Sequence, residues 1–340
     1  MPERPFIIAT RGSALALAQA NAIYDQCRKA FPRLVFEIKI IKTTGDKLQT
    51  AALNQEGQSL PKGLFTKELE VALLKHHADL AVHSLKDLPT ELPSGLKLGA
   101  VGKRADVRDV LVYRDAEHLR EVAAKQSVVE WTPGQAERRG LKPKAGLKDL
   151  PKGWAIATSS PRRKVQLLAL RPDLTVVDIR GNVPTRLQKL DERAELDGLI
   201  LAAAGFERLH FQIKPDGRLV GDAVPDGLLA IHFEPEQMLP CVGQGAIGIE
   251  IRENDERIAT ICERLNHFNT QQCVIAERAF LSAMGGGCQS PVGAYAEVIG
   301  HQIRMRAVSF QNGPARRTEA RRVVKEAIEL GQQIAAELKA

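Results

Sequence analysis

The chain has 340 residues, of which 44% are apolar and only 4% aromatic, so we expect two or three domains with largely aliphatic cores. A formal net charge of +7 indicates an anionic partner. The basic residues are spread along the chain with few aromatic side chains among them, which favours an acidic small molecule and argues against nucleic acid.

The sequence carries neither a signal-peptide pattern nor a membrane-spanning one, so we expect a soluble, cytoplasmic protein that binds no membrane. Its cysteines are odd in number, widely spaced and free of any CxxC pair. Neither a disulfide framework nor a zinc site is expected from this pattern, and no metal is predicted. The cysteines are Cys27, Cys241, Cys262, Cys273 and Cys288.

Short apolar runs alternate with helix-periodic segments along most of the chain. Strands are predicted at 6–10, 35–41 and 79–83, and helices at 14–30 and 65–77. The alternation begins again after residue 105, with strands predicted at 110–113, 154–157, 176–179 and 199–202. This order favours parallel α/β sheets.

Two regions depart from the alternation. A basic stretch rich in proline and glycine, residues 115–153, is interpreted as a surface insertion that serves solubility. From about residue 265 the pattern becomes α+β, with a helix, strands near 292–298 and 302–310, and a long C-terminal helix predicted from about 316 to 340.

Three turns combine a strand end, an arginine and a helix start, at residues 9–13, 157–163 and 178–186. Ser13 and Ser160 are predicted N-caps, and Pro161 suits the first helical position. Free N–H groups at a helix start and a neighbouring arginine can bind an anion. Ordinary capping with solvated arginines is the alternative, but three such turns favour an anion-lined cleft at the strand ends.

Residues 83–89 place a carboxylate, an ammonium group and a hydroxyl within one turn after a predicted strand. Asp87, next to Lys86, is expected to stay ionised and to suit stabilisation of a cation that develops during a reaction. A helix cap with a surface ion pair explains these residues equally well. His83 could act as the base for a thiol, but a histidine at a strand end is more often structural.

Cys288 follows three glycines, at 285–287, between a predicted helix and a predicted strand. A glycine turn lets a bulky group approach the backbone closely. The thiol could therefore attack a substrate, bind a metal or carry a group, and the turn alone leaves all three open.

The chain resembles the porphobilinogen deaminase (hydroxymethylbilane synthase) family over roughly residues 6–310. The resemblance rests on the ordered segments TRGS (10–13), KGLFTKELE (62–70), HSLKDLP (83–89), TSS with RR (158–163), RGN (180–182), VGQGA (242–246) and GGC (286–288). It implies a dipyrromethane cofactor bound through a thioether to Cys288. It also implies stepwise condensation of four porphobilinogen molecules with loss of ammonia, followed by hydrolytic release of hydroxymethylbilane.

By this resemblance Asp87 is the catalytic residue and stabilises the azafulvene cation left when ammonia departs. The implied cofactor-binding residues are Cys288, Ser84, Lys86, Asp87, Thr158, Ser159, Ser160, Arg162, Arg163, Arg180, Gly181 and Gln244. The implied substrate-binding residues are Arg11, Ser13, Gln19, Lys62, Phe65, Arg180, Arg186 and Arg208.

The resemblance also implies a monomer with two α/β domains, like those of periplasmic binding proteins, flanking a cleft, and a small α+β C-terminal domain. Domain 1 would comprise residues 1–104 and 246–264, domain 2 residues 105–245, and domain 3 residues 265–340. Two alternatives remain: an anion-binding protein without catalysis, and a cysteine hydrolase that pairs Cys288 with His83.

Overall fold

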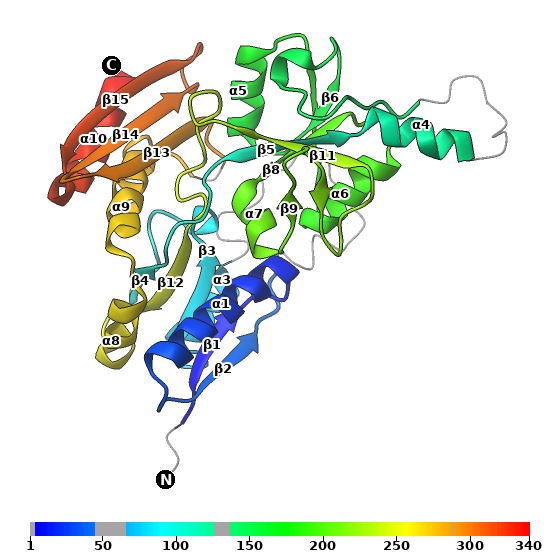
Figure 1. Cartoon of the computed structure of the whole chain (residues 1–340). Helices are drawn as coiled ribbons and strands as arrows, with labels where there is room; N and C mark the ends of the chain where they lie inside the picture. Colours follow the sequence, from blue (N-terminus) through cyan, green and yellow to red (C-terminus); the bar gives the residue numbers. More distant parts are fainter. Residues whose placement is uncertain (1–3, 45–65, 126–136, 288) are drawn as a thin grey trace. The chain divides into compact units, whose positions relative to one another are not determined.

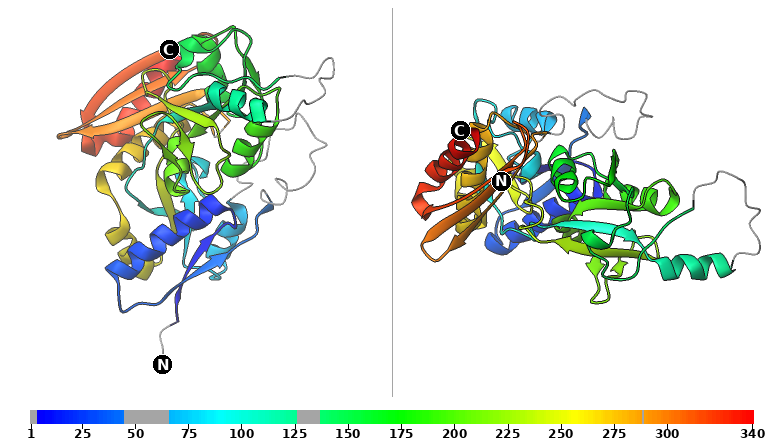
Figure 2. Two further views of the ribbon diagram at one scale, coloured as in Figure 1. Left: turned by 45° about the vertical axis from the view of Figure 1, so that its right-hand side comes forward. Right: turned by 90° about the horizontal axis from the view of Figure 1, so that it is seen from above.

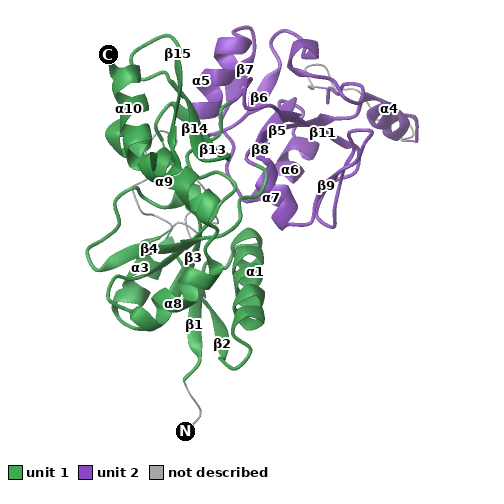
Figure 3. Ribbon diagram, turned by 60° about the vertical axis from the view of Figure 1, so that its left-hand side comes forward, with its two compact units in different colours: residues 1–106, 239–340 green, residues 107–238 purple. Residues whose placement is uncertain are grey.

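The structure, a computed structural model, describes residues 4–44, 66–125, 137–287 and 289–340. The chain forms two compact units (Figure 3). Unit 1 contains Met1–Asp106 and Leu239–Ala340, and unit 2 contains Val107–Met238. The predicted division into three domains stays a prediction.

Unit 1 contains a five-stranded sheet in the order β2-β1-β3-β12-β4 (Figure 1). The strands are β1 (Phe6–Thr10), β2 (Phe36–Ile40), β3 (Leu80–Ser84), β4 (Leu96–Val101) and β12 (Ile247–Arg252). The helices of this part are α1 (Ala14–Ala30), α3 (Lys67–Leu74) and α8 (Glu256–Leu265). The predicted strands at 6–10, 35–41 and 79–83 and the helix at 14–30 are confirmed; the described part of the helix predicted at 65–77 is α3.

Unit 2 contains a second five-stranded sheet in the order β11-β5-β8-β6-β7. The strands are β5 (Asp109–Arg114), β6 (Ala155–Ala157), β7 (Thr175–Val177), β8 (Gly198–Ala202) and β11 (Leu228–Phe233), with a small hairpin of β9 (Gln212–Ile213) and β10 (Leu219–Val220). The helices are α4 (Ala116–Lys125), α5 (Pro161–Leu170), α6 (Val183–Glu192) and α7 (Ala203–Arg208).

The two large sheets share one topology. In each sheet, one strand next to an edge strand runs antiparallel to both of its neighbours. In unit 1 this strand is β12, between β3 and β4, and in unit 2 it is β5, between β8 and β11. Each of these strands comes directly after the chain has crossed from the other unit. The α/β class is confirmed, but the expectation of purely parallel sheets was wrong. Buried runs such as that of β5 are apolar on both faces, so their pattern does not reveal strand direction.

The C-terminal part of unit 1 is an antiparallel sheet covered on one face by helices. The sheet order is β13-β14-β15, with β13 (Val292–Ile299), β14 (Gln302–Ser309) and β15 (Arg316–Val323). Figures 1 and 2 show α9 (Phe268–Ala283) and α10 (Ala327–Lys339) packed side by side against this sheet. The predicted α+β character is therefore confirmed.

The helix predicted from 316 to 340 was wrong in its first third, where β15 lies. The arginine, glutamate and alanine content of this segment favours a helix by propensity. In β15, however, Ala320 lies opposite Met305 and packs against the apolar core, while Glu319 pairs with Arg304. Pairing with the edge of β14 thus overrides local propensity.

The described part of the 115–153 insertion is more than a surface segment. Leu141 forms a β-bridge with Asp115, and the backbone N–H of Ala145 donates to the hydroxyl of Tyr113 at 2.9 Å. Ala145 and Leu150 are buried in the same core cluster as Trp154. The interpretation as a solubility insertion is corrected, because Ala145 and Leu150 pack in the core with Leu111 of the unit 2 sheet.

Candidate active site

In unit 1, polar residues follow the ends of two neighbouring parallel strands, β1 and β3. Ser13 caps α1 by accepting a hydrogen bond from the N–H of Ala16 at 3.3 Å, as predicted. Gln19, buried on α1, donates from Nε2 to the Oγ of Ser84 at 2.7 Å. The helix start after β1 is therefore joined directly to the end of β3.

A cavity of about 60 Å³ lies at these strand ends. The predicted site residues among those that line it are Arg11, Ser13, Gln19, Ser84 and Asp87. Leu15, Ala16, Thr66, Val82 and His83 complete its wall. Asp87 belongs to a 3-10 turn directly after β3 and is exposed, so its carboxylate is accessible to a ligand.

His83 is engaged inside unit 1. Its Nε2 lies 2.9 Å from Oε2 of Glu250 on β12, and both side chains are buried. This partner favours the interpretation of His83 as a satisfied interior residue over its use as the base for a thiol. Glu250 was not singled out in the sequence, because the fold alone brings β12 beside β3.

In unit 2, the turn after β6 is held by its own hydroxyl groups. The Oγ of Ser159 donates to the carbonyl of Ile179 at 2.8 Å and accepts from the N–H of the same residue at 2.9 Å. Ser160 occupies the N-cap position of α5 without a side-chain cap bond, and Pro161 lies in the first turn, as predicted. The turns after β6 and β7 are thus fastened together.

Arg162 and Arg163 are both buried and share one internal partner, Asp109. Nη1 of Arg162 lies 2.7 Å from Oδ2 of Asp109, and Nη2 of Arg163 lies 2.7 Å from Oδ1. Burial alone would raise the pKa of Asp109, but the two guanidinium groups hold that pKa well below its ordinary value. The two arginines are therefore less available to an external carboxylate than the sequence indicated.

The turn after β7 needs its glycine. Gly181 has φ of +120°, and a Cβ there would come within 2.8 Å of Thr185. The carbonyl of Gly181 accepts from Nε of Arg186 at 2.7 Å, and the carbonyl of Arg180 accepts from Nζ of Lys189 at 2.9 Å. Two cationic side chains thus bind the backbone of one turn. One of them, Lys189, is not among the site residues predicted from the sequence.

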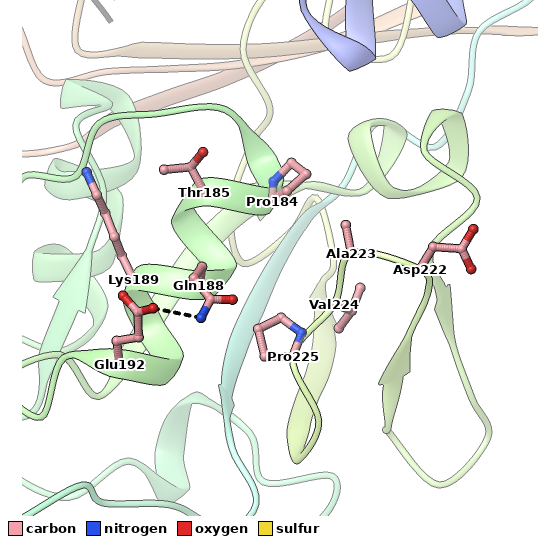
Figure 4. Close-up of a pocket in the computed structure, with 9 residues that line it drawn as sticks. All are labelled: Pro184, Thr185, Gln188, Lys189, Glu192, Asp222, Ala223, Val224 and Pro225. Atoms are coloured by element: carbon pink, nitrogen blue, oxygen red, sulfur yellow. Dashed lines mark hydrogen bonds between the residues drawn. The ribbon is translucent and has the colours of Figure 1, made fainter. Parts of the chain in front are cut away.

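Lys189 also lines a larger, more open pocket of about 560 Å³ beside α6 (Figure 4). Its wall is formed by α6 and by the segment from Asp222 to Pro225. None of the predicted site residues lines it, so its size does not identify it as the active site. Arg208, in the last turn of α7, is half-buried.

The glycine turn after α9 is held by hydrogen bonds between Gly287 and Ser290. Gly285 has φ of +69°, and a Cβ at Gly286 would collide with the side chain of Ser290. The N–H of Gly287 donates to Oγ of Ser290, and the N–H of Ser290 donates to the carbonyl of Gly287, both at 2.9 Å. Cys288 itself lies outside the described residues, as do Lys62 and Phe65.

Helix α9, which leads to this turn, is fastened to the loops around Asp87. The fully buried Glu277 accepts from Nη1 of Arg104 at 2.7 Å and from the N–H of Gly243 at 2.8 Å. Nη2 of Arg278 donates to the carbonyl of Pro89 at 2.6 Å. The backbone carbonyl of Gln244 accepts from Nε of Arg104 at 2.9 Å. Within unit 1 the helix before Cys288 and the turn bearing Asp87 are therefore parts of one network.

The other cysteines are free thiols. Burial raises the pKa of three of them, Cys27, Cys262 and Cys273, to about 12. Across the described ranges, no group of histidine, cysteine, aspartate and glutamate side chains could hold a metal ion. The same ranges contain no helix that is long and apolar enough to cross a bilayer.

The fold and these contacts define an α/β protein whose strand ends carry arginines, hydroxyl groups and an exposed aspartate. Residues 6–260 match the family model "Porphobilinogen deaminase, dipyromethane cofactor binding domain", and residues 271–340 match "Porphobilinogen deaminase, C-terminal domain". The chain belongs to the porphobilinogen deaminase family and is a transferase of tetrapyrrole biosynthesis that uses a dipyrromethane cofactor.

Individual relatives match along most of their length. The chain is 39% identical to the porphobilinogen deaminase of Alkaliphilus metalliredigens, over 96% of this chain and 86% of that protein. It is 42% identical to the enzyme of Thermus thermophilus, over 87% of this chain and 81% of that protein. The identity to the enzyme of Desulforamulus reducens is 39%, over 98% of this chain and 94% of that protein.

Proposed function

We propose that the chain joins four porphobilinogen molecules head to tail on a dipyrromethane primer held by Cys288, and then releases hydroxymethylbilane by hydrolysis. One observation carries the proposal: Arg11, Ser13, Gln19 and Ser84 line the same cavity as the exposed carboxylate of Asp87. Anion-binding groups and a carboxylate suited to cation stabilisation therefore lie side by side.

The residues present fit such a cofactor. Dipyrromethane bears acetate and propionate groups, which call for arginines, lysines and helix starts, and it needs open backbone at its attachment point. A Cβ at Gly285 or at Gly287 would meet no atom within 4 Å, so there is open space beside these two glycines. When bound, the group supplies the primer to which pyrrole units are added. Residues proposed to hold it are Cys288, Ser84, Lys86, Asp87, Thr158, Ser159, Ser160, Arg162, Arg163, Arg180, Gly181 and Gln244.

Asp87 is proposed to stabilise the positive charge that develops on the substrate as its amine leaves as ammonia. A fixed carboxylate at the site of developing charge lowers the barrier without reorganisation at the moment of reaction. The turn at residues 85–87 is fixed because Leu85 and Leu88 are buried in one cluster with Val274 of α9. The same carboxylate is proposed to accept a hydrogen bond from the pyrrole N–H of the incoming unit.

The arginines are proposed to share the work of binding carboxylates. Arg11, Arg180, Arg186 and Arg208 bind the acetate and propionate groups of the substrate, with Ser13, Gln19, Lys62 and Phe65 completing its site. Arg162 and Arg163, which Asp109 already holds, act mainly by fixing the hydroxyl-rich turn at residues 158–160. Bidentate arginine–carboxylate pairing gives this recognition its strength.

We further propose a monomer of the cytoplasm with the three domains expected from the sequence, residues 1–104 with 246–264, 105–245 and 265–340. Buried, free thiols at Cys27, Cys262 and Cys273 support a reducing compartment. The separate apolar core under β13–β15 supports a C-terminal domain.

The test is the variant Asp87→Asn, measured as hydroxymethylbilane formed and as intact mass of the purified protein. We expect the mass of the bound primer to be kept and kcat to fall on the order of 100- to 1,000-fold, because the developing cation loses its counter-charge. Glu91→Gln, the same chemical change at an exposed position four residues on, should behave like the wild type. Near-normal turnover by Asp87→Asn would overturn the catalytic role.

A further inference from the structure

A cluster of ionisable side chains lies buried in unit 1, directly beside the cavity. It contains His83 at the end of β3, Glu250 on β12 and Glu70 on α3. His83 and Glu250 are in hydrogen-bond contact at 2.9 Å, and Glu250 is completely buried. Nothing proposed so far for the reaction uses these three residues.

The cluster and the cavity share part of their structure. Thr66 and His83 line the cavity, and Thr66 precedes the first turn of α3, the helix that bears Glu70. His83 is followed immediately by Ser84 and then by the turn that carries Asp87. His83 therefore lies only four residues before the proposed catalytic carboxylate of Asp87.

One oxygen of the cluster has no partner. Oε2 of Glu250 contacts the imidazole of His83, whereas Oε1 of Glu250 is buried without a hydrogen-bond partner. Burial, and then the neighbouring Glu250 carboxylate, raise the pKa of Glu70, although Thr66 and His83 act the other way.

The surrounding charges are accounted for on each neighbouring element. Glu68 on α3 is bonded to Thr44, at 2.8 Å to its N–H and 2.6 Å to its hydroxyl. Arg252 on β12 is bonded to the carbonyls of Leu73 and Ala78, at 2.8 and 2.6 Å, and to two aspartates. Arg11 and Asp87 line the same cavity as His83. Neither Glu68 nor Arg252 is bonded to the cluster.

We propose that His83, Glu250 and Glu70 form a coupled, proton-binding cluster that positions the turn bearing Asp87 and makes turnover depend on the charge of the cluster. His83 and Glu250 are positioning residues, because they act through Asp87 and not on the substrate. The proposal rests on the proposed role of Asp87. A buried ion pair is weak evidence for stability but a known device for fixing one arrangement of the chain.

The experiment compares holoenzyme variants Glu250→Gln and Glu70→Gln with the wild type, measuring kcat and KM for porphobilinogen between about pH 6 and 9. For Glu250→Gln we expect kcat at neutral pH to fall about tenfold or more, with KM changed less than about twofold. We also expect at least one limb of the pH profile to move by about half a pH unit or more. Glu253→Gln, an exposed glutamate after the same strand, is the matched control and should keep the wild-type profile.

Glu70→Gln keeps the proposal testable if Glu250→Gln does not fold. The glutamine amide at position 70 mimics the neutral carboxyl that burial favours, so we expect this variant to fold. Its pH profile should be displaced, while its kcat stays within about threefold of the wild type. Folded variants whose pH profiles superimpose on that of the wild type would overturn the proposal. If Asp87→Asn is active, the proposed function fails; if it is inactive and these profiles are unchanged, only the present inference fails.

Discussion

Asp109→Ala removes the carboxylate that neutralises two buried guanidinium groups. Asp109 is completely buried, and Arg162 and Arg163 are 3% and 6% exposed, so neither arginine can recover its hydration without local unfolding. Breaking a buried ion pair by removing one partner costs about 3–5 kcal/mol, and here two cations lose the same partner. We therefore expect unit 2 to lose at least about 3 kcal/mol of its free energy of unfolding.

Tryptophan fluorescence during urea titration measures this loss in the right part of the molecule. Both tryptophans of the chain, Trp131 and Trp154, belong to unit 2, and Trp154 is buried. Asp226→Ala, the same change at an exposed position of unit 2, should leave the unfolding midpoint unchanged. A loss below about 1 kcal/mol for Asp109→Ala would refute the reasoning, because it is the size expected of a surface pair.

The ion pair also has a predicted pH dependence. The folded-state pKa of Asp109 is depressed, so its contribution to stability is fully present above the unfolded value of about 3.9 and is lost as the pH falls further toward the folded value. Acid unfolding of unit 2 should therefore become less steep below about pH 4 in Asp109→Ala. An unchanged slope in that range would contradict the assignment.

Two further predictions concern thiols and a turn. In the folded protein the buried thiols should resist alkylation at about pH 8, because burial keeps them protonated, and they should react once urea is added. Peptide mass mapping that finds any of them labelled in the folded chain would contradict this. These thiols are Cys27, Cys262 and Cys273. Gly181→Ala should raise KM for porphobilinogen and cost about 1–3 kcal/mol of stability, because φ at this position is +120° and the side chain of Thr185 leaves no room for a Cβ. A variant with the KM and stability of the wild type would show that the turn tolerates a side chain.

Local patterns predicted the elements that carry the cavity. Periodicity marked α1 to its first and last residue, and hydroxyl chemistry marked Ser13 as its cap. Strand ends with arginine and serine then indicated where an anion would bind. Arg11, Ser13, Gln19, Ser84 and Asp87 do lie together, because the ends of neighbouring parallel strands meet at one edge of a sheet.

Partners that only the fold brings together could not be predicted. Asp109 is the first residue of the buried strand β5, and no local pattern marks its role. It reaches Arg162 only because β5, β8 and β6 are neighbours in the sheet. Glu250 meets His83 because the chain returns to unit 1, where β12 lies, after the 132 residues of unit 2 (107–238). The sequence of β15 predicted a helix because the inward face of this charged strand contributes few apolar residues, Ala320 among them.

The central claim, a primer carried by Cys288, is tested most directly by intact mass spectrometry of the purified protein before and after brief exposure to porphobilinogen. We expect a mass above that of the sequence by one dipyrromethane, discrete further steps of one pyrrole unit on exposure, and the same results for Cys241→Ala, a half-buried cysteine elsewhere in unit 1. Cys288→Ala should have the mass of its sequence alone and form no hydroxymethylbilane. A wild-type chain that is unmodified yet active, or a Cys288→Ala chain that keeps the added mass, would contradict the account.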